Sequence, residues 1–353
     1  MLHLTDDEVI VWQNLGDAAR KGVLTPDTSL EQLRPALRPA LRFHIAVAVF
    51  AADPAMAGAW LDAGTGEEQE CRACSYLAGV VRRYGGLGMP TVVFRDPRPY
   101  IHFTTVPEIE GMRHRFQRFA ARTLAVYDRP VRFMDVGCGN GTLGIELLRT
   151  LRECAVIPGA AEIILIDPFP AMLETASKLV REAFPDAGIR LIEKRSENID
   201  DELPHDVDIA LCSLAIHHMP MERKRGLVNL LGQRCGDILL FEMNSDHDTP
   251  ELGDPRLSFS VYQSYGYMID RIFAHEAPLD IIQGCVDQFL LSEVISLLTQ
   301  PRGVRTDYHM TAAQWRTLFE GEGGCRLAAM EFCLATGGVE FFGQHFRRKA
   351  AGT

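Results

Sequence analysis

Three glycines separated by single residues carry the clearest chemical signal in the chain. They follow the apolar run Val131–Val136 and stand at Gly137, Gly139 and Gly141, with Asp135 two residues ahead of the first. Glycine lets the backbone turn tightly and lets a ligand approach without meeting a Cβ atom. A strand that runs into such a loop and then into a helix predicts a small-ligand site at the end of the strand.

A second acidic residue narrows the class of ligand. The spacing of Gly139, Gly141 and Gly144 also fits the dinucleotide-binding fingerprint. A carboxylate at Asp135 would repel a pyrophosphate but suits a ligand that carries an amino group. Asp167 ends the next apolar run, where its carboxylate can accept hydrogen bonds from both ribose hydroxyls. The sequence therefore favours a nucleoside with an amino group, and a nicotinamide dinucleotide is the alternative.

Two adjacent histidines are the candidates for acid–base chemistry. His217 and His218 come just after the apolar run Ile209–Ser213. Histidine is the usual base when a hydroxyl or a carbon acid must lose a proton. We expect one of the pair to act on the substrate, and the alternative is that both only pack near the bound ligand. His309 and His345 are expected to be structural.

The second part of the chain has the pattern of a sheet that could position these residues. From residue 131 onward, short apolar runs alternate with helical segments, which is typical of a doubly wound, largely parallel α/β sheet. Two further runs near the end, joined by a glycine-containing turn, predict a hairpin that adds an antiparallel last strand. The seven expected strands cover 131–136, 162–166, 190–193, 209–213, 238–242, 327–334 and 341–347.

The first part of the chain reads as mostly helical. Two β-rich runs, Thr91–Phe94 and Tyr100–Phe103, flank a Pro/Asp turn and predict a β-hairpin there. We expect an α-rich domain with this hairpin at 1–107 and a second domain at 108–353. Within the second domain, the stretch 244–309 breaks the strand–helix rhythm. It is expected to be an insertion that walls or covers a pocket, and a purely structural helical pair is the alternative.

Composition excludes several broad classes of protein. The chain has 353 residues and a net charge of −11, and it shows no basic patch, which argues against nucleic-acid binding. No apolar stretch approaches the roughly 20 residues that cross a bilayer, and the acidic start lacks a signal-peptide pattern. The nine cysteines are scattered, as expected for reduced thiols in a cytoplasmic protein. Cys71 and Cys74 are read as two small buried helix residues.

These motifs together resemble the class I S-adenosylmethionine-dependent methyltransferases. Asp135-Val-Gly137-Cys-Gly139-Asn-Gly141 resembles the first motif of that family, and the segment from Asp167 to Leu173 resembles its acidic second motif. The segment 208–220, which contains the two histidines, resembles the fourth-strand motif and its loop. The resemblance covers about residues 131–349. It implies a Rossmann-like fold and S-adenosylmethionine as the cofactor.

The resemblance also implies a role for each matching position. The three glycines would line the methionine moiety, and Asp135 would hold its ammonium group directly or through water. Asp167 would bind the ribose. After the third strand the family commonly has Gly-Asp, whereas this chain has Ser196 and Glu197, so either residue is a candidate for the adenine contact. The remaining expected cofactor contacts are Pro168, Met172 and Leu214.

The order of the domains implies a group within the family. An α-rich domain ahead of the catalytic domain resembles the dimerisation domain of the small-molecule O- and C-methyltransferases, which implies a homodimer. We expect a biosynthetic enzyme of secondary metabolism that C-methylates an α-keto acid, because four arginines of the insertion could anchor a carboxylate. The alternatives are O-methylation of a phenolic or carboxylate group on a small molecule or peptide, and a non-catalytic cofactor-binding protein. The four arginines are Arg256, Arg271, Arg302 and Arg305.

Some relatives in this group hold a metal ion near the acceptor, and the chain offers residues for one. His275 and Glu276 lie in the insertion and, with His218, would make a His/His/carboxylate set suited to iron or zinc. His275 is therefore a third candidate catalytic residue. A solvated pair on a helix surface is the alternative for His275 and Glu276.

Overall fold

The computed structural model describes residues 3–30, 33–88, 98–199, 203–336 and 338–349. Its chain divides into two compact units. The helical unit contains 1–110, 245–307 and 335–340, and the sheet unit contains 111–244, 308–334 and 341–353. The first segment of the helical unit ends at residue 110, and the domain boundary at 107 stays a prediction. The insertion, predicted to belong to the second domain, groups instead with the N-terminal helices.

The sheet unit is built on seven strands in the order β3-β2-β1-β4-β5-β7-β6. β1 to β5 pair in parallel, and β7 runs antiparallel to β5. This confirms the predicted Rossmann-like sheet with an antiparallel strand. The strands are β1 Val131–Val136, β2 Ala160–Ile166, β3 Gly188–Ile192, β4 Val207–Ser213, β5 Cys235–Met243, β6 Cys325–Thr336 and β7 Val339–Arg348.

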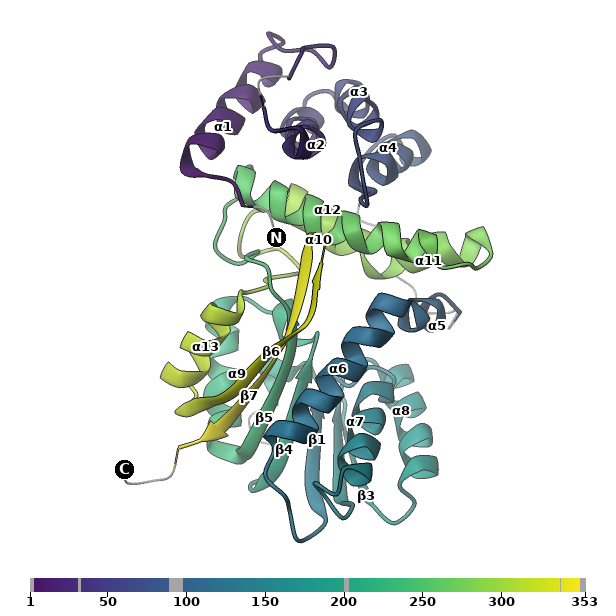
Figure 1. Cartoon of the computed structure of the whole chain (residues 1–353), viewed down its shortest axis with the longest axis vertical. Helices are drawn as coiled ribbons and strands as arrows, with labels where there is room; N and C mark the ends of the chain where they lie inside the picture. Colours follow the sequence, from purple (N-terminus) through teal and green to yellow (C-terminus); the bar gives the residue numbers. More distant parts are fainter. Residues whose placement is uncertain (1–2, 31–32, 89–97, 200–202, 337, 350–353) are drawn as a thin grey trace. The chain divides into compact units, whose positions relative to one another are not determined.

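Helices cover both faces of this sheet. Figure 1 shows α7 and α8 on one face and α9 with α13 on the other. The strands between these layers are nearly continuous apolar runs, and β1, β4 and β5 are buried along almost their whole length. Burial on both faces explains why these strands do not alternate apolar with polar residues. The helices are α7 Thr142–Glu153, α8 Pro170–Ala183, α9 Met221–Arg234 and α13 Ala312–Gly321, with short 3₁₀ turns η2 Ser196–Asn198 and η3 Ile216–His218.

The helical unit is formed by the N-terminal helices together with the insertion. α10 packs against α2 and α4, and α11 packs against α5. Because α10 buries fourteen of its residues, it is a core helix of this unit rather than a peripheral excursion. The elements are α1 Asp6–Arg20, η1 Pro35–Leu37, α2 Arg38–Phe50, α3 Pro54–Thr65, α4 Ala73–Tyr84, α5 Arg98–Thr105, α10 Pro255–Ala274, α11 Leu279–Phe289 and α12 Leu291–Thr299; α6 Pro107–Thr123 crosses the boundary between the units.

The N-terminal hairpin prediction is wrong in its second arm. Residues Tyr100–Phe103 lie inside helix α5, and the first arm, Thr91–Phe94, lies outside the described residues. Pro99 is in the first turn of α5, a position where proline is well tolerated because no helical N–H bond is lost there. A four-residue run of aromatic and β-branched residues is too short to distinguish a strand from a helix.

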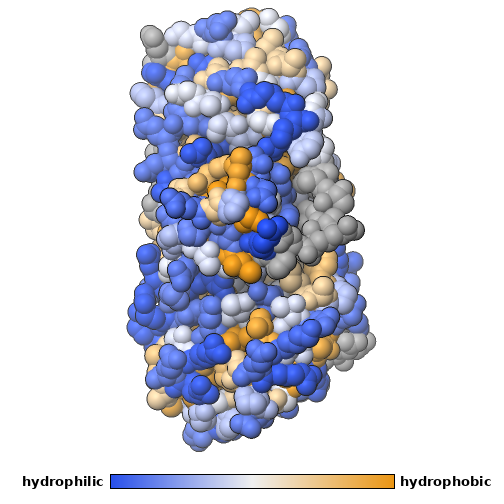
Figure 2. Space-filling view, turned by 90° about the vertical axis from the view of Figure 1, so that its right-hand side faces the viewer, coloured by the Kyte–Doolittle hydropathy of each residue, from blue (hydrophilic) through white to orange (hydrophobic). Residues whose placement is uncertain are grey.

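The face of the molecule drawn in Figure 2 is mainly polar. Figure 2 shows one face, on which hydrophilic residues predominate and hydrophobic residues form small separate groups. Among the described helices, none is by itself long and apolar enough to span a membrane. The bent pair of α11 and α12 meets that test jointly, by length and composition only.

Candidate active site at the carboxyl ends of the strands

The loop after β1 has the conformation that only glycine adopts without strain. Gly137, Gly139 and Gly141 have φ angles of +73°, +53° and +76°. A Cβ atom on Gly137 would lie 2.3 Å from the Cβ atom of Ala215, in the loop after β4. The three predicted glycines therefore let the β1 and β4 loops approach each other closely.

Asp135 lies beneath this loop with its carboxyl group buried. Burial and the nearby Asp167 carboxylate raise the pKa of Asp135 to about 7. A Cβ atom on Gly144, at the start of α7, would lie only 2.5 Å from Asp135 Oδ2. Gly144 thus makes room for the carboxyl group of Asp135. A carboxylate buried there would favour a ligand whose positive charge compensates it.

Asp167 is held in place by backbone N–H groups. Its Oδ2 accepts a hydrogen bond from Gly139 N, and its Oδ1 accepts one from Phe169 N, both at 2.9 Å. Burial raises the pKa of Asp167 above its usual range, although these two donors and the charge of His218 act in the opposite direction. Each oxygen keeps a lone pair that a ribose hydroxyl could use.

The other predicted cofactor contacts lie around the same edge of the sheet. Pro168 is exposed and Met172 is half-buried in the first turn of α8, while Ser196 and Glu197 are half-buried in η2 after β3. Leu214 has a φ of +48°, which is rare for a residue with a branched side chain. Such backbone strain clusters at functional sites. Which of Ser196 and Glu197 would meet the adenine stays a prediction.

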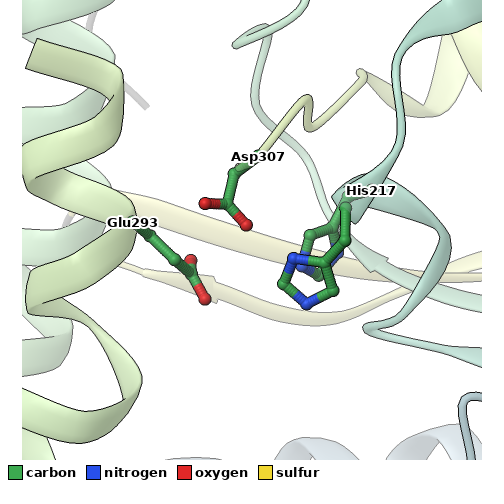
Figure 3. Close-up of side chains that lie close together, drawn as sticks. His217, Glu293 and Asp307 are labelled. Carbon is green, nitrogen blue, oxygen red and sulfur yellow. The ribbon is translucent and has the colours of Figure 1, made fainter. Parts of the chain in front are cut away.

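His217 is buried and hydrogen-bonded to a carboxylate. It belongs to η3 after β4 (Figure 3), and its Nδ1 lies 2.8 Å from Glu242 Oε2 at the end of β5. Because a carboxylate only accepts hydrogen bonds, we assign the proton of the neutral ring to Nδ1, which leaves Nε2 as the basic nitrogen. The next residue, His218, is exposed and acts electrostatically on Asp167. The two adjacent histidines therefore face different surroundings.

A third histidine joins this group. The ring of His309 packs against that of His217, with centroids 3.9 Å apart and planes tilted by 30°, and His309 Nδ1 lies 3.9 Å from Glu242 Oε2. His217, Glu242 and His309 are all buried, and their candidate ligand atoms lie within 4.8 Å of one another, so the set could also hold a metal ion. The 2.8 Å separation between His217 and Glu242 is that of a hydrogen bond, which fits an acid–base pair directly.

Glu242 is not among the residues predicted from the sequence, and His309 was predicted only as a structural residue. A glutamate that ends an otherwise apolar strand, Ile-Leu-Leu-Phe-Glu, was the available signal for the first. No local signal pointed to His309, because it reaches His217 only through the packing of distant segments.

The predicted residues of the insertion are engaged within the helical unit. His275 stacks on His102 with centroids 4.9 Å apart, and its Nε2 lies 3.2 Å from Thr105 Oγ1, while Glu276 is exposed. Glu293, on α12 (Figure 3), accepts a hydrogen bond from Tyr265. A cavity of about 710 Å³ in the same unit is lined by segments of α2 and α10 and by the 67–71 loop.

The four arginines proposed as carboxylate anchors also have partners in that unit. Arg305 is 4% exposed and donates to backbone carbonyls, so it is a structural residue. The other three pair with carboxylates: Arg256 with Asp6 at 2.7 Å, Arg271 with Glu108 at 3.7 Å and with Asp270, and Arg302 with Asp248 at 3.4 Å.

Comparison with known proteins decides the class of the sheet unit. Residues 133–232, from β1 to α9, match the family described as a methyltransferase domain. This segment is a methyltransferase domain. It is of the class I, S-adenosylmethionine-dependent type, as the loop after β1 and the acid at the end of β2 predicted. A yeast protein described as the probable S-adenosylmethionine-dependent methyltransferase CRG1 (Saccharomyces cerevisiae) is 30% identical over 137 residues.

The shared region with that relative is limited. It covers 39% of this chain and 43% of the yeast protein, so the chain spans less than half the length of this relative. Among solved structures, magnesium protoporphyrin IX methyltransferase of Synechocystis is 14% identical, with a TM-score of 0.41 over 71% of this chain and 91% of that one. The 1,6-didemethyltoxoflavin-N1-methyltransferase of Burkholderia thailandensis is 12% identical, with a TM-score of 0.42 over 74% and 94%. At these values neither structure indicates what the chain acts on.

Proposed function

We propose that the chain transfers a methyl group from S-adenosylmethionine to a small molecule. The observation that carries the proposal is the β1 loop, in which three glycines at positive φ lie beside the two carboxyl groups of Asp135 and Asp167. These residues fit the cofactor, because a buried acid suits its ammonium group and a backbone-held acid suits its ribose. When bound, S-adenosylmethionine supplies a methyl group on a positively charged sulfur.

The protein's own contribution is to position an acceptor and to take its proton. In-line methyl transfer needs the acceptor atom held against the methyl carbon, which is a matter of orientation. His217 Nε2 receives the proton that a hydroxyl or a carbon acid must lose, and Glu242 holds the ring and stabilises the resulting imidazolium. The short turn that carries His217 also carries Ala215, which lies against Gly137, so the base is close to the cofactor loop.

Two acceptor classes are consistent with such a base. C-methylation of an α-keto acid is the class predicted from the sequence, and it needs a cation to hold the carboxylate. The four arginines that suggested this anchor are engaged with other groups. O-methylation of a phenolic hydroxyl is the second candidate, because it needs a base but no cation to anchor a carboxylate. The contacts of the four arginines with other groups favour this second candidate. The homodimer, the cytoplasmic location, the role in secondary metabolism and the His218–His275–Glu276 metal site stay predictions.

A panel assay tests the proposal. The full chain is incubated with S-adenosylmethionine and single members of a set of phenols and α-keto acids, and S-adenosylhomocysteine formation is measured. We expect turnover with one class and a loss of at least about 10²-fold in His217→Ala. Turnover that is equal in wild type and His217→Ala would contradict the role of His217. The metal prediction is checked separately by metal content: about one iron or zinc per chain, lost in His275→Ala, would support it.

A further inference from the structure

Lys224 is a charged residue in the core of the sheet unit. It lies on α9, its side chain is 1% exposed, and its Nζ donates a hydrogen bond to the carbonyl oxygen of Tyr308. The ring centroids of Trp315 and Tyr308 lie 5.1 and 5.9 Å from the same nitrogen. A buried ammonium group is costly unless hydrogen bonds and aromatic faces compensate it. Packing alone would be served better by an apolar side chain of the same length.

Tyr308, which Lys224 contacts, is hydrogen-bonded to His217, the proposed base. Tyr308 N donates a hydrogen bond of 2.8 Å to the carbonyl oxygen of His217. The residue after Tyr308 is His309, whose ring packs at a tilt against the ring of His217. The ammonium group of Lys224 therefore holds a segment that contacts His217 twice, once through the backbone of Tyr308 and once through the imidazole of His309.

We propose that Lys224 is a positioning residue for His217. It fixes Tyr308, and Tyr308 with His309 restricts the ring of His217 to the orientation in which Nδ1 faces Glu242 and Nε2 faces the acceptor. The inference rests on the proposed function, since it concerns the same base. A shift of about 1 Å in a reacting group costs about 10²-fold in rate, so a loose base would be a poor one.

The test reads the tautomer of His217 directly and needs no acceptor. The full chain is labelled with ¹⁵N-histidine, and the His217 ring signals are assigned by their absence in His217→Ala. In the wild type we expect a single neutral tautomer with the proton on Nδ1. In Lys224→Met, whose unbranched apolar side chain is one bond shorter than lysine and has no donor, we expect a mixture of both tautomers. The matched control is Lys178→Met on α8, whose lysine is exposed and pairs with Glu174 on its own helix.

A folded Lys224→Met protein with the wild-type His217 signals would overturn the inference. If that variant does not fold, Lys224→Gln replaces it: its amide is one bond shorter and uncharged, so we again expect mixed tautomers, and wild-type signals in the folded Gln variant would overturn the inference equally. S-adenosylhomocysteine binding, measured on the same samples, keeps the two claims apart. Its absence in the wild type contradicts the proposed function, whereas unchanged tautomers contradict only the role of Lys224.

Discussion

Asp135 holds its carboxyl group in a place that disfavours the ionised form. Burial and Asp167 raise its pKa to about 7, and a cationic ammonium group would bind only the carboxylate. We therefore predict that the affinity for S-adenosylhomocysteine rises about tenfold per pH unit up to pH 7 and then levels off. Calorimetry between pH 5.5 and 8.5 measures this, and in Asp135→Asn the pH dependence should vanish.

The raised pKa of Asp135 also determines how the stability of the ligand-free protein changes with pH. Since the folded state binds the Asp135 proton more tightly than the unfolded state, its free energy of unfolding should fall as pH rises from about 4 to about 7. Denaturant unfolding of wild type and Asp135→Asn across this window measures the difference. A wild-type curve that parallels the Asn variant would contradict the assigned environment.

Gly144 is the residue that makes room for Asp135. In Gly144→Ala the new Cβ atom would lie 2.5 Å from Asp135 Oδ2, so the carboxyl group or α7 must move. We predict a loss of roughly tenfold in S-adenosylhomocysteine affinity, equivalent to about 1.4 kcal/mol. Gly226→Ala on α9 is the matched control, because among the described residues no atom beyond its chain neighbours and its own helix backbone lies within 4 Å of the added Cβ. That variant should bind normally and gain up to about 1 kcal/mol in stability.

Substitution of Glu242 tests whether Glu242 and His217 act as an acid–base pair. Glu242→Gln keeps the size of the side chain but can donate to His217 Nδ1 and so favour the wrong tautomer. Once the panel identifies an acceptor, we predict a fall in kcat of about 10²–10⁴-fold with an unchanged affinity for S-adenosylhomocysteine. The exposed Glu322→Gln on the same unit is the control. A kcat within twofold of wild type in Glu242→Gln would exclude the pair as the base.

At the scale of elements, side chains at the amino-terminal end of β5 bind the antiparallel strand β7, at the end of the sheet opposite the candidate site. Asp237 at the start of β5 accepts hydrogen bonds from His345 at 2.7 Å, from Tyr127 at 2.6 Å and from Arg347 at 2.8 Å. Burial alone would raise the pKa of Asp237, but these three donors bring it below its usual value. Stability from this group is therefore present above about pH 4 and is lost as the pH falls through the lowered pKa.

We predict that Asp237→Asn lowers the free energy of unfolding at pH 7 by about 1–3 kcal/mol, because the group loses its charge and one of its two acceptor oxygens. S-adenosylhomocysteine binding should not change, since Asp237 lies at the far end of β5 from Glu242. Urea unfolding with calorimetry on the same samples checks both parts. Weakened binding without loss of stability would contradict the assignment of this group as structural.

Elements with a strong local signal were predictable from the sequence. β1 has its predicted bounds because an apolar run there ends abruptly in glycines, and the other strands differ only in length at their ends. The segment around Tyr100 has no such signal, since its aromatic and β-branched residues suit a strand while Pro99 suits a helix start. This segment forms a helix because Pro99 suits the first helical turn and because of its tertiary packing.

At the scale of the whole molecule, the sequence order conceals which segments pack together. The insertion 245–307 follows β5 directly, yet α10 packs on α2 and α4 and belongs to the helical unit. The base is assembled in the same way, from His217, Glu242 and His309, which lie on three separate elements. The cofactor residues could be predicted because they follow two strands at fixed spacing. The partners of His217 could not, because only the folded sheet brings them together.

The most direct test of the account is a calorimetric titration of the full chain with S-adenosylhomocysteine and, separately, with NADH. We expect one S-adenosylhomocysteine site per chain, at least tenfold weaker binding in Asp167→Ala, and no heat from NADH. Binding of NADH without binding of S-adenosylhomocysteine, or an Asp167→Ala protein that binds S-adenosylhomocysteine as the wild type does, would contradict it.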